Sequence, residues 1–179
     1  NFKLESWDWW YYAEKVRKEK FDLDEEQIRP YFKLDNVLDG AFLVSQKLFG
    51  LSFTRLDNMP LYHPDCQVFE VKDADNSLIG ILYMDFYARD SKKGGAWMNN
   101  YREQYVSKDG NEIRPVVSVT CNFPKPVGDT PSLLSYDDVE TLFHEFGHAL
   151  HGLLSQCMYK GVSGTRVSRD FVELPSQIM

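Results

Sequence analysis

The chain carries two histidines one helical turn apart with a glutamate between them, in the string His144-Glu145-Phe146-Gly147-His148. Residues four apart share one face of an α-helix, so both imidazoles can bind one metal ion from a single rigid element. Glu145 lies about 100° further round the helix than His144, where its carboxylate can act on a metal-bound water without being a ligand. The spacing therefore predicts a helix that carries both a metal site and a catalytic base.

A third ligand has to come from elsewhere in the chain, because catalytic zinc sites have three protein ligands and keep an open position for water. Downstream of His148 the only acidic residues are Asp170 and Glu173. The class in which a third histidine binds the metal would need a glycine and a histidine where His151 and Leu154 stand. Residues three apart share a helix face, so one candidate can bind the metal while the other supports a ligand. The spacing favours Glu173, which has the longer side chain, and leaves Asp170 open.

The helix that bears this string has clear sequence signals. Ser135 and Asp138 predict a capped start. The apolar stripe that follows consists of Val139, Leu142, Phe143, Phe146, Leu150 and Leu153. Gly147 costs about 1 kcal/mol relative to alanine inside a helix, so we expect another segment to approach the backbone closely there. His151 lies near the face of His148, where it either supports a metal ligand from behind or belongs to the core, and the first interpretation is favoured.

The size and charge of the chain restrict its partners. With 179 residues it is long enough for one domain with a buried core. A net charge of −7 leaves no basic surface for a nucleic acid. The longest apolar run, residues 78–84, is too short to cross a membrane. We therefore expect neither a nucleic-acid partner nor a membrane partner.

The three cysteines, Cys66, Cys121 and Cys157, are widely spaced and form no CxxC pair. This pattern is not a disulfide framework and favours a reducing compartment. The expected location is cytoplasmic, and a periplasmic location stays open because any signal segment would precede Asn1. The start at Asn1 and the end at Met179 are interpreted as those of an excerpt from a longer protein.

Hydrophobic spacing predicts two further helices and a set of strands. One helix is expected from a cap at Ser6 to about Lys18, and a second from after Asp35 to before Gly50. Runs rich in β-branched and aromatic residues predict strands at residues 51–55, 67–73, 78–87 and 116–122. Residues 73–76 have the composition of a hairpin loop. Strands joined this closely pair antiparallel, so the predicted fold class is α+β, with a small antiparallel sheet beside the helices.

Two longer strings around the candidate site resemble the thimet oligopeptidase and neurolysin family of zinc oligopeptidases. They are HEFGHALHG at residues 144–152 and DFVELPSQ at residues 170–177. Upstream, YMDFYARD at residues 83–90 and GGAWM at residues 94–98 are similar to the bacterial dipeptidyl carboxypeptidase branch of that family. The resemblance runs over essentially the whole chain.

The resemblance implies a site and a reaction. His144, His148 and Glu173 would bind one Zn²⁺, and Asp170 would support a ligand from behind. Glu145 would be the general base that takes a proton from a zinc-bound water during hydrolysis of a peptide bond. The implied substrates are short peptides, from which C-terminal dipeptides would be released.

The resemblance also implies a longer, mainly helical protein, monomeric, with two lobes around a narrow channel. Residues 1–179 would be part of its catalytic domain, with a zincin-type core built on the HExxH helix. The N-terminal helical lobe and the C-terminal remainder would lie outside this chain. Ser163, Gly164 and Thr165 would lie along the substrate cleft. The residues that stabilise the oxyanion would follow Met179, so the isolated chain is expected to be inactive.

Two other hypotheses stay open. One is a non-catalytic module that is stabilised by zinc or binds a peptide, in which Cys121, Cys157 or His151 would close the site as a fourth protein ligand. The other is a hydrolase of the deformylase type, with Cys121 as a metal ligand. The strings around Glu173 argue against this second hypothesis.

Overall fold

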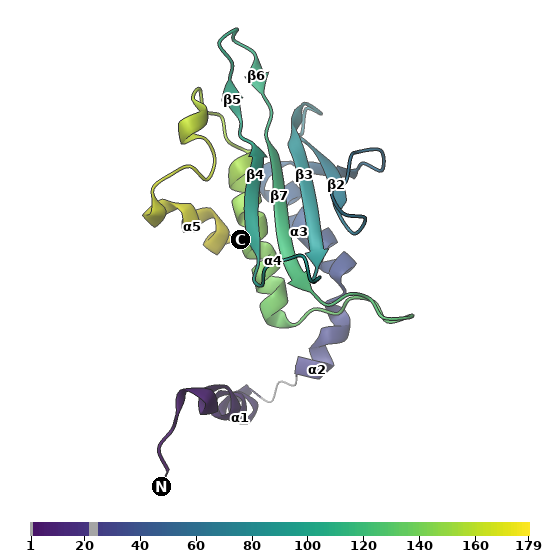
Figure 1. Cartoon of the computed structure of the whole chain (residues 1–179), viewed down its shortest axis with the longest axis vertical. Coiled ribbons are helices and arrows are strands. Elements are labelled where there is room, and N and C mark those ends of the chain that lie inside the picture. The colour runs from purple at the N-terminus through teal and green to yellow at the C-terminus, as the bar shows by residue number, and fades with distance from the viewer. Residues whose placement is uncertain (1, 22–24) are drawn as a thin grey trace.

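The molecule combines α-helices with one main β-sheet (Figure 1). The computed structural model describes residues 2–21 and 25–179. Within those ranges there are five α-helices, a five-stranded sheet and a separate two-stranded hairpin. No helix there is long and apolar enough to cross a lipid bilayer.

The elements follow one another in a simple order along the chain. The α-helices are α1 (Trp9–Phe21), α2 (Glu25–Ile28), α3 (Leu34–Phe49), α4 (Tyr136–Leu153) and α5 (Arg169–Ile178). Short 3₁₀ turns are η1 (Ser6–Asp8), η2 (Arg29–Tyr31) and η3 (Lys160–Val162). The main sheet contains β1 (Ser52–Arg55), β2 (Gln67–Lys72), β3 (Leu78–Tyr87), β4 (Trp97–Arg102) and β7 (Val116–Phe123). The hairpin consists of β5 (Tyr105–Val106) and β6 (Glu112–Ile113).

The strands of the main sheet lie in the order β1-β2-β3-β7-β4. β1, β2 and β3 pair antiparallel, as predicted, with the turn at residues 73–76 between β2 and β3. β7, however, pairs parallel to β3 and antiparallel to β4, so the sheet is mixed and the prediction of an antiparallel sheet is wrong. A short connection forces antiparallel pairing, whereas more than a dozen residues separate β3 from β7 and allow a parallel return. Strand β4, which the sequence did not predict, occupies part of that connection.

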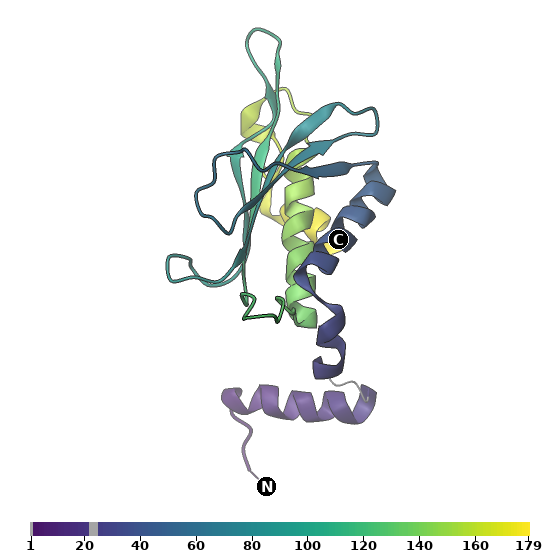
Figure 2. The same cartoon turned by 90° about the vertical axis from the view of Figure 1, so that its right-hand side faces the viewer.

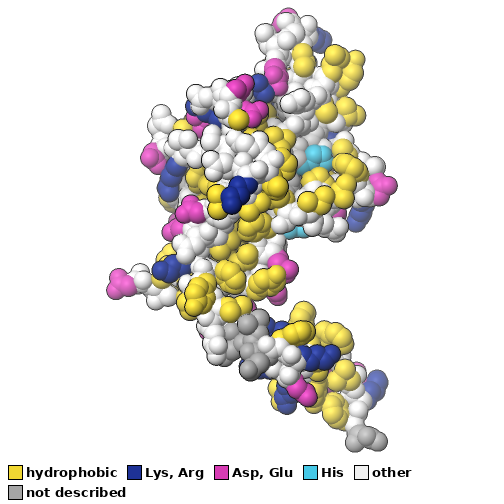
Figure 3. Space-filling view, turned by 180° about the vertical axis from the view of Figure 1, so that it is seen from behind, with side chains coloured by type: hydrophobic (Ala, Val, Ile, Leu, Met, Phe, Trp, Pro, Cys, Tyr) yellow, Lys and Arg dark blue, Asp and Glu magenta, His cyan; other side chains and the backbone are white. Residues whose placement is uncertain are grey.

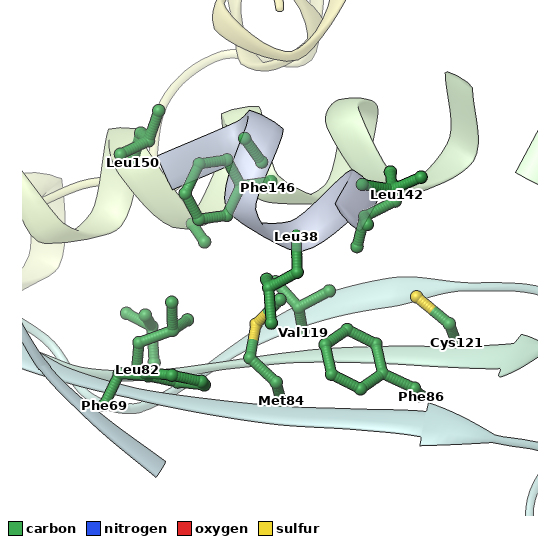
Figure 4. Close-up of a cluster of buried hydrophobic side chains, with 14 of the residues drawn as sticks. Leu38, Phe69, Leu82, Met84, Phe86, Val119, Cys121, Leu142, Phe146 and Leu150 are labelled. Carbon is green, nitrogen blue, oxygen red and sulfur yellow. The ribbon is translucent and has the colours of Figure 1, made fainter. Parts of the chain in front are cut away.

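Helices α3 and α4 cover one face of the sheet (Figure 2). Leu82, Met84 and Phe86 alternate along β3 and are fully buried, because side chains two apart on a strand point to the same face. They form one cluster with Leu142 and Phe146 of α4 (Figure 4). Burying each such side chain contributes about 1.5–3 kcal/mol. This layer therefore holds α4, the helix that carries both histidines, against the sheet.

Helix α4 begins where the sequence predicts. The Ser135 side chain accepts a hydrogen bond from the Asp138 backbone at 3.1 Å, and the Asp138 carboxylate accepts one from the Ser135 backbone at 3.0 Å. The buried members of the predicted stripe are Leu142, Phe146, Leu150 and Leu153. The cap and the stripe together fix the start of α4 and the face that it turns toward the sheet.

Two helices were predicted in the N-terminal part of the chain, and their observed boundaries agree with the prediction to different extents. Helix α3 ends before Gly50, which adopts a left-handed conformation with φ of 74° and caps the helix, as predicted. The first helix starts differently, because Glu5 rather than Ser6 is the N-cap residue. A 3₁₀ turn then precedes α1.

Helix α5 packs on α4 at Gly147, where the sequence predicts a close approach. A Cβ atom at Gly147 would lie 2.6 Å from Cα of Ser176 and 2.9 Å from the carbonyl oxygen of Pro175. Both neighbours are backbone atoms of α5, so no side-chain rotation makes room for a methyl group. The prediction is confirmed: glycine is required here because the two helix backbones are in contact.

A buried ion cluster fixes the connection from β3 toward β4. Asp85 is 1% exposed, and its carboxylate accepts two hydrogen bonds of 2.7 Å from Arg89 and one of 3.1 Å from Lys92. Tyr62 donates a further hydrogen bond of 3.1 Å to the same carboxylate. Burial alone would raise the pKa of Asp85, but the hydrogen bonds from Arg89 and Lys92 outweigh it and hold the pKa below its ordinary value.

Replacing Gly147 by alanine should destabilise the protein by about 1–3 kcal/mol, because the added methyl group has to displace the α5 backbone. The matched control is Gly40→Ala in α3, where a Cβ atom would have no neighbour within 4 Å. That change should stabilise the protein by up to about 1 kcal/mol, the helix-propensity difference. Chemical unfolding of both variants measures the two effects, and a stability for Gly147→Ala equal to or above that of the unsubstituted protein would contradict the contact.

The free energy of unfolding should depend on the charge of Asp85. Its pKa is lower in the folded protein than in the unfolded chain, so its stabilising effect is complete above the unfolded value of about 3.9 and is lost as the pH falls through the folded value. Asp85→Asn should lower the free energy of unfolding by about 3 kcal/mol at neutral pH, since two largely buried cations lose their partner. The difference between the two proteins should shrink in acid. Unfolding curves measured across the acid range test this, and a constant difference at every pH would contradict it.

Candidate functional site

Three side chains predicted as metal ligands converge in the structure. Nε2 of His144 lies 3.1 Å from Oε2 of Glu173, and Nε2 of His148 lies 3.2 Å from the same oxygen. One donor atom from each residue lies within 4.8 Å of the other two, and the described ranges contain no other such group of three histidine, cysteine or acidic side chains. Histidine side chains reach the surface among hydrophobic ones on the helical side of the molecule (Figure 3). The side chains of His144 and Glu173 are 38% and 49% exposed, so the group is open to solvent.

Two helices supply these side chains. His144 and His148 lie one turn apart on α4, with ring centroids 4.9 Å apart and ring planes at 89° to one another. Glu173 comes from α5, which lies close enough because its backbone contacts Gly147. Ser176, three residues further along α5, donates a hydrogen bond of 3.0 Å to Oε2 of Glu173. This hydrogen bond orients the carboxylate toward the two imidazoles.

Burial and hydrogen bonding favour the forms of His148 and Glu173 that bind metals. Burial lowers the pKa of His148, which keeps its imidazole neutral with a free lone pair. The hydrogen bond from Ser176 lowers the pKa of Glu173, with help from the two histidines, and keeps the carboxylate ionised. Neutral imidazole and ionised carboxylate are the forms that metal ligands require.

The donor set fits a zinc ion. Two imidazole nitrogens and one carboxylate oxygen are typical of catalytic zinc sites. Zinc–ligand bonds of about 2.0–2.2 Å at tetrahedral angles separate neighbouring donor atoms by roughly 3.3 Å. The separations of 3.1 and 3.2 Å between Glu173 and the two histidines are close to that value. A neutral imidazole nitrogen and a carboxylate oxygen this close also repel one another unless a cation or a proton lies between them.

Glu145 is buried beside this group and is 9% exposed. Burial raises its pKa and the charge of Glu173 adds to that effect, while His144 and a backbone hydrogen bond from Met98 act against it, and the net change is upward. A carboxyl group with a raised pKa can accept a proton and release it again near neutral pH. The arrangement places a group suited to acid–base chemistry next to a set of metal donors.

The two residues expected to support a ligand, Asp170 and His151, differ in burial. The Asp170 side chain is exposed, and in the described ranges no hydrogen bond or ion pair joins it to either histidine of the candidate site. His151 is half-buried and packs against Phe171, with ring centroids 6.2 Å apart. In the same part of the chain, Nδ1 of His148 and Nδ1 of His151 are buried without a hydrogen-bond partner. The supporting roles of Asp170 and His151 stay predictions.

The residues predicted along a substrate cleft make internal contacts. Ser163 is 1% exposed, and its hydroxyl lies 3.0 Å from that of Ser155. The Gly164 backbone donates a hydrogen bond of 2.9 Å to the same Ser155 hydroxyl. Thr165 accepts a hydrogen bond of 3.0 Å from the Asn100 side chain. These contacts tie the segment to the end of α4 and to β4, and its contact with a substrate stays a prediction.

The cysteines lie apart from the three donors. Cys121 is fully buried in the core, and burial raises the pKa of its thiol. Cys157 lines an apolar cavity beside α4. Among the described residues, neither cysteine nor His151 belongs to the group around Glu173. The hypotheses that need one of them as a fourth ligand therefore gain no support.

Strand β4 is the part of the site that the sequence analysis missed. It is an edge strand. Its Met98 backbone interacts with the Glu145 carboxyl group, and its Asn100 side chain donates a hydrogen bond to Thr165. Edge strands bury little, so their hydrophobic alternation is weak. The available signal was a pair of aromatic residues, Trp97 and Tyr101, that favour strands.

Comparison with known proteins places the chain in a family. Residues 1–179 match Peptidase family M3. The dipeptidyl carboxypeptidases of Salmonella typhimurium (strain LT2) and Escherichia coli (strain K12) are 52% and 51% identical to it over 178 residues, and oligopeptidase A of E. coli is 43% identical. Each alignment covers 99% of this chain and 26% of the relative, so the chain spans about a quarter of the length of these relatives. The resemblance predicted from the paired strings is confirmed, and the chain belongs to peptidase family M3.

Proposed function

We propose that this chain is the zinc-binding core of a peptidase that hydrolyses peptide bonds in short peptides. The observation that carries the proposal is the convergence of His144, His148 and Glu173 on one point, with Glu145 buried beside them. Membership of a peptidase family supports peptide hydrolysis as the reaction class.

In this proposal His144, His148 and Glu173 hold one Zn²⁺. Bound there, the ion would lower the pKa of a water molecule from 15.7 to about 7 and would polarise the carbonyl group of the substrate. His148 offers a neutral imidazole because burial lowers its pKa. Ser176 limits rotation of the Glu173 carboxylate through its hydrogen bond of 3.0 Å. A site with three protein ligands leaves a fourth position free, which hydrolysis requires.

Glu145 is the proposed general base. Its carboxylate accepts a proton from the attacking water and then delivers that proton to the nitrogen of the departing amine. The water oxygen forms a bond to the carbonyl carbon, and the bond between that carbon and the amide nitrogen breaks. The raised pKa of Glu145 supports both steps, because a carboxyl group that titrates closer to neutrality holds the proton more readily between them.

Release of C-terminal dipeptides is the specificity that we propose within this class. It is supported by the names of the two relatives that are 52% and 51% identical, both dipeptidyl carboxypeptidases, against 43% for oligopeptidase A of E. coli. The two specificities give different products. A dipeptidyl carboxypeptidase would shorten a peptide stepwise from its carboxyl end, whereas an endopeptidase would cut within it.

A second candidate function is a non-catalytic module that binds zinc or a peptide. Such a module would close the zinc site with a fourth protein ligand. The donor group in the described part of the chain contains three residues, and its carboxylate is half-exposed. These observations favour the catalytic proposal over the closed site.

Digestion of a peptide of defined sequence by the natural polypeptide that carries this chain tests the specificity. Products should be shorter by two residues at the carboxyl end, and removal of zinc with a chelator should stop their formation. Mass spectrometry of the products, with and without the chelator, gives both results. Cuts confined to internal bonds would contradict the dipeptidyl assignment, and cleavage that persists without metal would contradict the zinc mechanism.

Replacing Glu145 by glutamine should reduce turnover by a factor of about 10²–10⁴, because an amide cannot accept the proton. Bound zinc should stay near one ion per chain, since the three ligands are unchanged. The control is Glu19→Gln, which removes the same charge from an exposed position in α1 and should leave both quantities unchanged. The two measurements are made on the same preparation, and near-normal turnover by Glu145→Gln would mean that another group is the base.

A further inference from the structure

The connection from α4 to α5 is held by residues at the end of β4. The Asn100 side chain donates a hydrogen bond of 3.0 Å to the Thr165 hydroxyl. The Gln104 side chain accepts one of 2.7 Å from the Cys157 backbone. Between these two residues Glu103 makes an ion pair with the same connection. We refer to Asn100, Glu103 and Gln104 as the strand-end clasp.

Glu103 is the charged member of the strand-end clasp. Its side chain is 7% exposed, and its Oε1 accepts a hydrogen bond of 2.7 Å from Nε of Arg166 and lies 2.7 Å from Nη2 in the same ion pair. Nζ of Lys160 lies 3.5 Å from its other oxygen. A nearly buried carboxylate depends on such partners, because desolvation without them is costly. The pair therefore strongly restrains the position of Arg166.

Helix α5 is poorly equipped to fix its own position. It has ten residues, fewer than the roughly 12–15 that an isolated helix needs for marginal stability. Pro175 in its interior lacks a backbone N–H and removes one helical hydrogen bond. Ser176 is its one buried residue in the described chain, and Phe171, Leu174 and Ile178 are exposed. The position of α5 therefore depends on the contact with Gly147 and on the segment that precedes it.

We propose that Glu103 is a positioning residue for the metal ligand Glu173. Arg166 lies three residues before the first residue of α5, so the ion pair with Glu103 restrains the chain just before the helix begins. Fixing that start fixes how closely the Glu173 carboxylate approaches the two imidazoles. The inference rests on the proposed function, because it takes the three donors to bind zinc.

The test is the zinc affinity of the natural polypeptide that carries this chain, measured by competition with a chelator. Glu103→Gln should raise the dissociation constant for zinc about tenfold, the lower end of the effect seen for residues that orient metal ligands. The matched control is Glu112→Gln, which removes an equally short ion pair of 2.7 Å with Arg114 from the neighbouring hairpin. That control should leave the zinc affinity unchanged.

A double-mutant cycle tests whether Glu103 acts on zinc binding through its pair with Arg166. Arg166→Gln changes a side chain that is 55% exposed and should also weaken zinc binding. The double variant Glu103→Gln with Arg166→Gln should bind zinc no more weakly than Glu103→Gln alone, because both changes break the same pair. If the two changes acted independently, their effects on the zinc affinity would instead add in the double variant.

Equal zinc affinities for Glu103→Gln and Glu112→Gln would overturn the inference, and so would additive effects in the cycle. If Glu103→Gln does not fold, Arg166→Gln carries the test, and an unchanged dissociation constant in that variant overturns the inference. Failure of the unsubstituted protein to bind zinc would overturn the proposed function itself. That result is distinguishable because it appears before any residue is changed.

Discussion

Close contact between the α5 backbone and Gly147 of α4 determines whether the three donor side chains can meet. A Cβ atom at Gly147 would lie 2.6 Å from Cα of Ser176, so any other residue there would push the helices apart. Glu173 lies within one turn of Ser176 and would move with it. The separations of 3.1 and 3.2 Å between its carboxylate and the two histidines would then be lost. The glycine costs about 1 kcal/mol of helix propensity, and the contact that it permits offsets this.

The sheet supports this pair of helices in two ways. Its inner face packs under α4 through Leu82, Met84 and Phe86 and fixes the helix that carries both histidines and Glu145. Its edge strand β4 contacts Glu145 through the Met98 backbone and the connection to α5 through the strand-end clasp. One edge of the sheet thus contacts both the candidate base and the segment that leads to the candidate third ligand.

Local features of the site could be predicted from the sequence, and long-range features could not. The cap at Ser135, the apolar stripe of α4 and the close approach at Gly147 follow from spacing within one helix, and the structure confirms them. The parallel pairing of β7 with β3 follows a long connection that contains the edge strand β4, and the weak hydrophobic alternation of β4 did not predict a strand there. The contacts of the strand-end clasp join residues that are 53, 63 and 65 positions apart, and no local pattern marks such pairs. Spacing left Asp170 open beside Glu173, whereas the structure brings Glu173 to the histidines because of where α5 crosses α4.

X-ray absorption at the zinc edge, on the natural polypeptide that carries this chain, tests whether His144, His148 and Glu173 bind zinc. We expect one zinc ion with two imidazole nitrogens at about 2.0–2.1 Å and oxygen ligands at about 2.0–2.2 Å. We expect no sulfur in the coordination sphere, since Cys121 and Cys157 lie outside the donor group. Substituting Glu173 by glutamine should change the oxygen contribution and leave the imidazole contribution. A zinc–sulfur distance of about 2.3 Å, or an unchanged spectrum in that variant, would mean that other residues bind the metal.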